Sequence, residues 1–206
     1  MLSVPSRDGK NDARDCAGWL LEKQLGLRLW PVHRLDFEVS GLLLFAKDAD
    51  AHRVANEAFE YGRIQKTYQA LTTSHARAPD PRLHEGYDTL NVGAENETVL
   101  WSAPIVRGKR RSFVAAHGKE SLTRARWTHH EQGRLWFLEP LTGRSHQLRV
   151  HLALAGFPII GDALYGSTES VGDGIALHAW RLDFSAIPDV KRFGLPTSIE
   201  APPRFC

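Results

Sequence analysis

The chain of 206 residues is long enough for one domain that buries a core without disulfides or metals. Its 42% hydrophobic and 24% charged residues are typical of a globular protein, which excludes a disordered or fibrous chain. The net charge of +2 is too small to identify a nucleic-acid-binding protein, although 19 of the 26 basic residues are arginine, whose planar group suits phosphates and base edges.

Cysteine usage and hydropathy indicate a cytoplasmic protein. Cys16 and Cys206 are isolated, so they form neither a Cys-x-x-Cys pair nor a disulfide framework, as expected in a reducing compartment. No apolar run of signal-peptide type occurs near the N-terminus, and no stretch approaches the roughly 18 apolar residues of a membrane span. Secretion and membrane insertion are therefore not expected.

The first quarter of the chain is predicted to hold two helices and one buried strand. Residues 13–25 repeat apolar side chains at helical spacing, and residues 11–12 are suited to cap that helix. Residues 42–46 form a continuous apolar run of strand length. Residues 48–61 return to helical spacing, and a glycine follows each of the two helices.

The rest of the chain is predicted to be rich in strands. Residues 122–127 alternate cleanly, which places Arg124 and Arg126 on one face, where they contact either solvent or RNA. A helix is expected over residues 145–155, with Ser145 as its N-cap. Further strands are predicted at residues 66–72, 99–105, 112–116, 135–141 and 177–184.

Strands that follow one another with few helices between them predict an α+β fold with a mixed, mostly antiparallel central sheet and flanking helices. No linker-like composition interrupts the pattern, so residues 1–206 are expected to form a single domain.

The most informative segment is residues 31–41, where a His-Arg-Leu-Asp tetrad ends at Asp36 just before the apolar run. A carboxylate beside a buried strand is costly unless a cation or a reaction uses it. Arg34 is a candidate for contacting an anionic substrate. By residue type alone, Asp36 is equally a cap or a surface charge, Tyr68 a core aromatic and Arg149 a structural salt bridge.

Four segments, in this order, resemble the RluA-type pseudouridine synthases. They are residues 33–41, residues 66–70 (Lys-Thr-Tyr-Gln-Ala), residues 142–152 (Thr-Gly-Arg-Ser-His-Gln-Leu-Arg-Val-His-Leu) continuing to 166, and residues 177–182 (Leu-His-Ala-Trp-Arg-Leu). The resemblance implies the catalytic-domain fold of that family and isomerisation of uridine to pseudouridine in RNA.

The N-terminal side departs from the family. Residues 2–5 resemble a segment that in relatives follows a strand with a Lys-Pro-x-Gly turn, and that strand has no counterpart here. No part of this sequence is expected to form the small additional RNA-binding domain that many relatives carry ahead of the catalytic domain. Substrate recognition is then expected to come from the catalytic domain itself.

The resemblance also implies residue roles. Asp36 is the expected nucleophile, and a bidentate ion pair with Arg149 would keep it charged and oriented. Tyr68 would stack on the everted base and offer a hydroxyl for proton transfer, with Leu148 packed on the other side of the base. Arg34 would fill the space that the base leaves. The candidate substrate-binding residues are Arg34, His33, Leu148 and Arg144, although His33 is equally suited to positioning the loop.

The chemistry itself stays open. An ionised carboxylate can attack the sugar, attack the uracil ring, or remove a sugar proton to give a glycal, and each route needs one aspartate and no cofactor. No histidine spacing suits a metal, and no glycine-rich nucleotide fingerprint precedes a suitable helix, so neither a metal nor a nucleotide cofactor is expected.

The expected partner is RNA, which is transfer RNA, large-subunit ribosomal RNA or both. The protein is expected to be a monomer. The basic turn at residues 107–111 is either a solvated turn or a phosphate contact. Two rival functions are a catalytically silent RNA-binding module on the same fold and a different hydrolase or glycosidase that uses Asp36. The glycosidase would need a second carboxylate as general acid, and Glu38 is poorly placed for that role.

Overall fold

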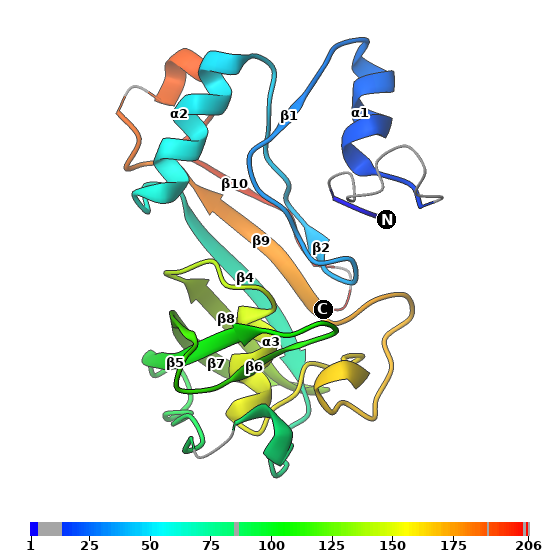
Figure 1. Cartoon of the computed structure of the whole chain (residues 1–206), viewed down its shortest axis with the longest axis vertical. Helices are drawn as coiled ribbons and strands as arrows, with labels where there is room; N and C mark the ends of the chain where they lie inside the picture. The colour runs from blue at the N-terminus through cyan, green and yellow to red at the C-terminus, as the bar shows by residue number, and fades with distance from the viewer. Residues whose placement is uncertain (4–13, 85–86, 189, 204, 206) are drawn as a thin grey trace.

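An eight-stranded mixed sheet forms the centre of the structure (Figure 1). The computed structural model describes residues 1–3, 14–84, 87–188, 190–203 and 205. The strands of the sheet are β2 (Ser40–Gly41), β4 (Gln65–Thr72), β5 (Val99–Arg107), β6 (Ser112–Val114), β7 (Lys119–His130), β8 (Gly133–Pro140), β9 (Leu177–Asp183) and β10 (Ser198–Glu200).

The sheet order is β10-β9-β4-β8-β7-β5-β6, and every neighbouring pair along it is antiparallel. The short β2 adds to β9 in the parallel direction. This arrangement confirms the predicted α+β fold with a mixed, mostly antiparallel sheet. Two further strands, β1 (Trp30–Pro31) and β3 (Phe45–Ala46), pair with each other outside this sheet.

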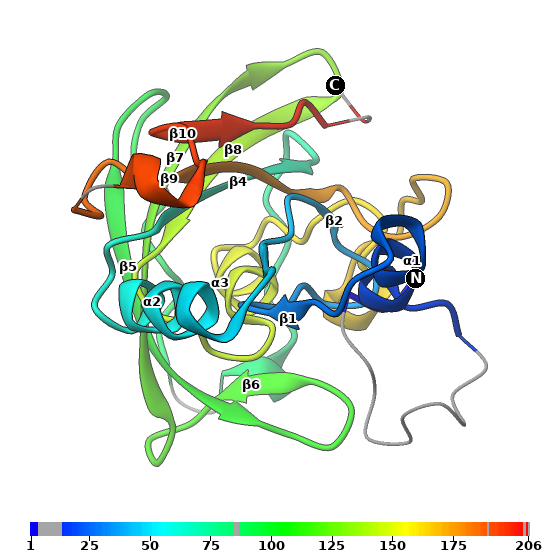
Figure 2. The ribbon, with the colours of Figure 1, turned by 90° about the horizontal axis from the view of Figure 1, so that it is seen from above.

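The sheet curls around one helix, as the view from above shows (Figure 2). That helix is α3 (Gln147–Leu154), and all of its residues are buried, which is the condition of a helix packed on every side. α1 (Ala17–Leu25) and α2 (Ala49–Glu60) lie away from it, and three short 3-10 turns complete the described helical structure. Those turns span Pro81–Leu83, Ala163–Tyr165 and Val190–Phe193.

Tryptophans fill the space between the sheet and α3. Trp101 on β5 and Trp136 on β8 are fully buried, with ring centroids 5.3 Å apart. The Trp136 indole N–H donates to the Thr72 hydroxyl, and that of Trp101 donates to the Asn91 carbonyl, so neither buried donor is left without a partner. The core thus fixes α3 against the sheet, and residues near its N-terminus line the site described below.

Two predicted elements differ from the structure. Of the expected strand at residues 42–46, only Phe45–Ala46 is a strand. Leu42 and Leu44 pack against the hydrophobic cluster beneath α2, and each forms one backbone hydrogen bond, with Ala179 and Val32 respectively, without continuing a ladder. The predicted cap Ser145 is also wrong, since α3 begins at Gln147 after His146. The caps expected at residues 11–12 lie outside the described residues, and α1 begins only at Ala17.

His151 on α3 forms a buried polar network with β7. The Ser121 hydroxyl donates to the Ala103 carbonyl, so it accepts the Nε2–H of His151 at 2.8 Å. The opposite ring nitrogen, Nδ1, lies 3.0 Å from the Thr123 hydroxyl and serves as an acceptor. A second proton on this imidazole has no place in the network.

The free energy of unfolding is therefore expected to decrease as the pH is lowered, because of His151. Burial lowers the pKa of His151 from 6.5 to about 4. Between these two pH values the unfolded chain binds a proton at this residue and the folded chain does not. The contribution of His151 to the free energy of unfolding is fully present above pH 6.5 and is lost as the pH falls toward 4. Its upper bound is about 3 kcal/mol.

Urea unfolding at pH 7 and at pH 4.5 measures this effect. The His151→Gln protein should lose less unfolding free energy between the two pH values than the wild-type protein does. An equal loss in both proteins would assign the pH dependence to other groups, such as His33.

Candidate active site

A cavity of about 320 Å³ opens where the loop before β2, the middle of β4 and the segment leading into α3 meet. Its wall carries one carboxylate, that of Asp36, and several cations. Apolar surface comes from Val39, Leu148 and Leu177. The charged lining residues are Arg34, Asp36, Lys66, Arg107, Arg144 and Arg149.

The loop that carries Asp36 is held from both of its ends. The Ser3 hydroxyl donates to the Leu35 carbonyl at 3.0 Å and accepts from the Leu35 amide at 3.2 Å. On the other side, Gly41 of β2 lies against β9 with a φ of 113°, and a Cβ there would lie 2.4 Å from the Ala179 carbonyl oxygen. Only glycine permits this close pairing, which fixes the loop over the cavity.

Arg149 is the centre of the charges at this site, and its side chain is only 2% exposed. Its Nε and Nη2 bind the two oxygens of Asp162 at 2.7 and 2.8 Å. Its Nη1 lies 3.2 Å from Glu38 and 3.8 Å from Asp36. The bidentate pair predicted between Arg149 and Asp36 is therefore wrong: the fork binds Asp162 and leaves one nitrogen directed at Asp36.

This arrangement leaves Asp36 more accessible than a bidentate pair with Arg149 would. Burial alone would lower the pKa of Arg149, but hydrogen bonds to Asp162 and the charges of Glu38 and Asp36 raise it, so the guanidinium stays charged. Asp36 is 29% exposed, and its distance of 3.8 Å from Arg149 is too long for a hydrogen bond. Its oxygens are therefore open to a substrate. Asp162 falls within the third motif, between residues 152 and 166, but no role was predicted for it.

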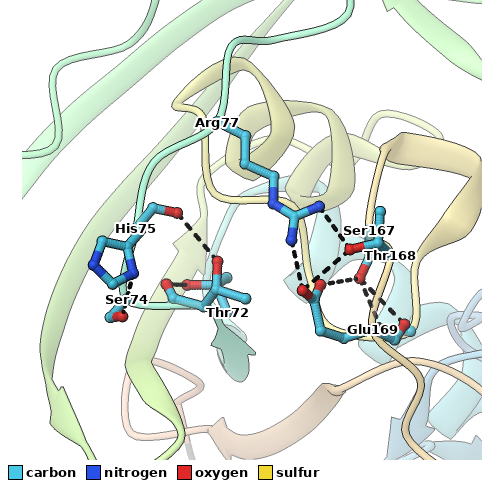
Figure 3. A network of polar contacts seen from close by, with 9 residues as sticks. Thr72, Ser74, His75, Arg77, Ser167, Thr168 and Glu169 are labelled. Atoms are coloured by element: carbon cyan, nitrogen blue, oxygen red, sulfur yellow. Dashed lines mark hydrogen bonds and ion pairs between the residues drawn. The ribbon is translucent and has the colours of Figure 1, made fainter.

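The loop that holds Asp162 is itself braced. Arg77, after β4, donates to Thr168 and to Glu169, and Ser167 accepts from the Gly161 amide and donates to Glu169 (Figure 3). The Ser167 amide also donates to the Asp162 carbonyl. These contacts attach the Asp162 loop to the end of β4.

Tyr68 lies in the cavity wall, where β4 shifts register between Thr67 and Tyr68 against β9. Burial and, to a smaller extent, the charge of Asp36 raise the pKa of its hydroxyl above 10. Leu148, 7% exposed, is also in the wall, so both predicted faces of a base-binding slot line one cavity.

Four cations surround the opening. Arg34 and Arg144 were expected from the sequence, and Arg144 is anchored by donating its Nε–H to the Glu120 carbonyl. Lys66 and Arg107 were not assigned to the site, although the basic turn that begins at Arg107 was noted. Within the described ranges, neither Arg34 nor Arg107 forms an ion pair.

His33, one of the predicted substrate-binding residues, does not line the cavity. Its Nε2 accepts the Leu44 amide N–H at 3.1 Å, and its ring packs on Phe59 with a centroid distance of 5.2 Å. Burial and then the charge of Lys66 lower its pKa to about 4, so it stays neutral and keeps this acceptor. The structure supports the alternative that His33 positions the loop.

His146 lines the cavity and was quoted in a motif without a role. It is the residue before α3, with a left-handed backbone at φ 54°, ψ 23°. Its Nδ1 lies 2.9 Å from the hydroxyl of buried Tyr165. Among the described residues, no cluster of three or more His, Cys, Asp or Glu side chains could hold a metal, and no helix is long and apolar enough to cross a membrane.

Comparisons with known proteins agree with this geometry. The family described as RNA pseudouridylate synthase matches residues 3–154. An uncharacterized RNA pseudouridine synthase of Zymomonas mobilis is 33% identical over 205 residues, covering 97% of this chain and 85% of the relative. The dual-specificity RNA pseudouridine synthase RluA of Pasteurella multocida is 33% identical over 185 residues, covering 85% of this chain and 74% of the relative.

Structural comparison gives the same family. The human RNA pseudouridylate synthase domain containing 1 superposes with a TM-score of 0.68 at 26% identity, covering 90% of this chain and 73% of that one. The chain therefore belongs to the RNA pseudouridylate synthase family and is a pseudouridine synthase of the RluA type, an isomerase that acts on RNA.

Proposed function

We propose that the chain converts specific uridines in transfer RNA, large-subunit ribosomal RNA or both, with Asp36 as the nucleophile. The observation that carries this proposal is a single open carboxylate in a cavity, 3.8 Å from the buried guanidinium of Arg149. The reaction requires a carboxylate whose oxygens can reach the substrate, and the 29% exposure of Asp36 provides that access.

The lining suits one everted nucleotide. A uracil ring that enters the cavity would stack on Tyr68 and pack against Leu148, and this contact offsets the few kcal/mol needed to take the base out of its stack. Arg34 at the edge, free of an ion pair in the described part of the chain, would occupy the space left in the RNA.

The positive rim supports a phosphate-rich substrate. Arg34, Lys66, Arg107 and Arg144 surround one carboxylate, so the opening favours a polyanion despite the small net charge of the chain. We propose that a monomer consisting of this single catalytic domain provides all of these contacts. The dual-specificity name of the Pasteurella relative is a reason to test two RNA classes side by side.

The test is to incubate the purified protein with transfer RNA and ribosomal RNA from cells that lack it, and then to map new pseudouridines. A parallel Asp36→Ala preparation reveals any contaminating synthase. New pseudouridine at discrete sites with the wild-type protein alone supports the proposal. RNA binding without any new pseudouridine would instead indicate a silent RNA-binding module.

RNA affinity is expected to fall steeply with salt, because each phosphate contact releases counterions. Arg107→Gln should reduce the slope of log K against log salt by about 0.7 to 0.9, the value of one contact. The matched control is Arg53→Gln, because Arg53 lies on α2 and is already paired with Asp50 and Glu57. Filter binding at several salt concentrations measures both slopes, and an unchanged slope for Arg107→Gln would remove this residue from the RNA contact.

A further inference from the structure

His146 combines three features that the role of Asp36 does not use. It lines the cavity, its backbone is left-handed although it is not glycine, and one side of its ring is attached to Tyr165. A left-handed backbone costs a non-glycine residue about 1 kcal/mol, and such strain persists where surrounding contacts demand it. Despite this cost, the folded protein keeps the imidazole of His146 in the cavity wall.

Hydrogen bonds around Tyr165 determine which nitrogen of His146 carries the proton. The Tyr165 hydroxyl accepts from the Ser112 amide at 2.9 Å and donates its one proton to the Ser112 carbonyl at 3.2 Å. The contact of 2.9 Å with His146 Nδ1 therefore needs Nδ1–H as the donor. The neutral ring then carries its free lone pair on Nε2, for which the described part of the chain provides no hydrogen-bond partner.

Pseudouridine formation needs a proton acceptor in this cavity. When C5 of the released base has bonded to C1′ of the ribose, C5 still carries a hydrogen that must leave as a proton. Tyr68 is a poor acceptor, because its raised pKa leaves fewer than about one molecule in a thousand ionised at pH 7. Lys66 is also unsuited, because its ammonium lies over the Phe59 ring, 5.5 Å from the centroid.

On the basis of the proposed function, we propose that His146 is the general base that removes the C5 proton. Nε2 takes the hydrogen as a proton, the C5–H electron pair forms the C5=C6 double bond, and the electron pair of the N1=C6 bond moves to N1. The imidazolium then returns this one proton to N1, directly or through water. The step remains an isomerisation without a co-reactant.

The charges around His146 suit this role. Burial lowers the pKa of His146, and the charge of Arg149 lowers it further, so the neutral base is present at pH 7. The carboxylates of Asp36, Glu38 and Asp162 act in the opposite direction, and they stabilise the imidazolium when it forms. Tyr165 is a positioning residue, because it orients the ring and holds the proton on Nδ1.

Two variants test the proposal on a transcript that the wild-type protein modifies. His146→Gln should lower kcat by about 10² to 10⁴-fold, and its remaining rate should slow further when the target uridine carries deuterium at C5. His146→Gly matches the left-handed backbone without strain and leaves space for a small molecule. Added imidazole should restore part of its rate, and thermal unfolding confirms that it folds.

Two controls separate chemistry from structure. His129→Gln, an exposed histidine on β7, should keep the wild-type rate. Tyr165→Phe should lower kcat by about tenfold, and its pH–rate profile should shift because the ring loses the acceptor that keeps the proton on Nδ1.

A His146→Gln protein with the wild-type rate would overturn the proposal. So would a slow variant that shows neither a deuterium effect nor rescue by imidazole. If the wild-type protein itself forms no pseudouridine, the proposed function fails instead, and the two failures are thereby distinguished.

Discussion

Asp36→Asn is expected to lower the rate of pseudouridine formation by about 10⁴-fold or more, because the amide is neither a nucleophile nor a base. Stability should change little. Asp36 is 29% exposed and its ion pair with Arg149 spans 3.8 Å, so its loss is expected to cost no more than about 1 kcal/mol of unfolding free energy. Binding of RNA should persist, since the cations at the rim remain. Single-turnover kinetics and filter binding measure these quantities on the same preparation.

Glu38→Gln is the matched control for this prediction. Glu38 lies closer to Arg149, at 3.2 Å, but it does not line the cavity and is 40% exposed. The variant should keep most of the activity, because it removes a charge from the same guanidinium without removing the open carboxylate. Loss of activity in Glu38→Gln together with an active Asp36→Asn protein would reverse the two roles.

Asp162→Ala is expected to destabilise the fold by about 3 kcal/mol, because it leaves the buried guanidinium of Arg149 without its bidentate partner. Both side chains of this pair are nearly inaccessible, at 2% and 1% exposure. For a chain of this length, such a loss lowers the melting temperature by about 10 °C. Glu38 and Asp36 remain near Arg149, so the cost should lie at the lower end of the range for a broken buried pair.

Thermal unfolding of two further proteins checks this explanation. Arg149→Met leaves Asp162 buried without a cation and should also be destabilised, whereas Arg149→Met combined with Asp162→Leu should cost less than the sum of the single changes. A cost that equals the sum would mean that the two side chains act independently. Activity should be lost in every protein that lacks Arg149.

The sequence was sufficient for the parts of the protein that depend on local pattern. Alternation over residues 122–127 placed the buried and exposed faces of β7 correctly, with Ala125 buried and Arg124 exposed. The second and third motifs, which contain Tyr68 and Leu148-Arg149 respectively, led to residues that line one cavity. The shared motifs were also enough to identify the family.

Contacts between distant segments could not be predicted in the same way. The partner of Arg149 depends on which carboxylate the fold brings within 3 Å of its guanidinium. Asp36 and Glu38 before β2 and Asp162 after α3 all carry carboxylates, so residue type alone does not choose among them. The left-handed backbone of His146 gives no sequence signal, since glycine or asparagine would ordinarily mark such a position. The apolar run at residues 42–46 looked like a strand because burial and strand pairing produce the same pattern.

The contact between Ser3 and Leu35 joins the start of the described chain to the loop that carries Asp36. One hydroxyl supplies both an acceptor and a donor to a single residue, and the residue that follows it is Asp36. A protein shortened by its first three residues would therefore keep every side chain of the cavity and still form pseudouridine slowly, because Asp36 would spend less time facing the cavity.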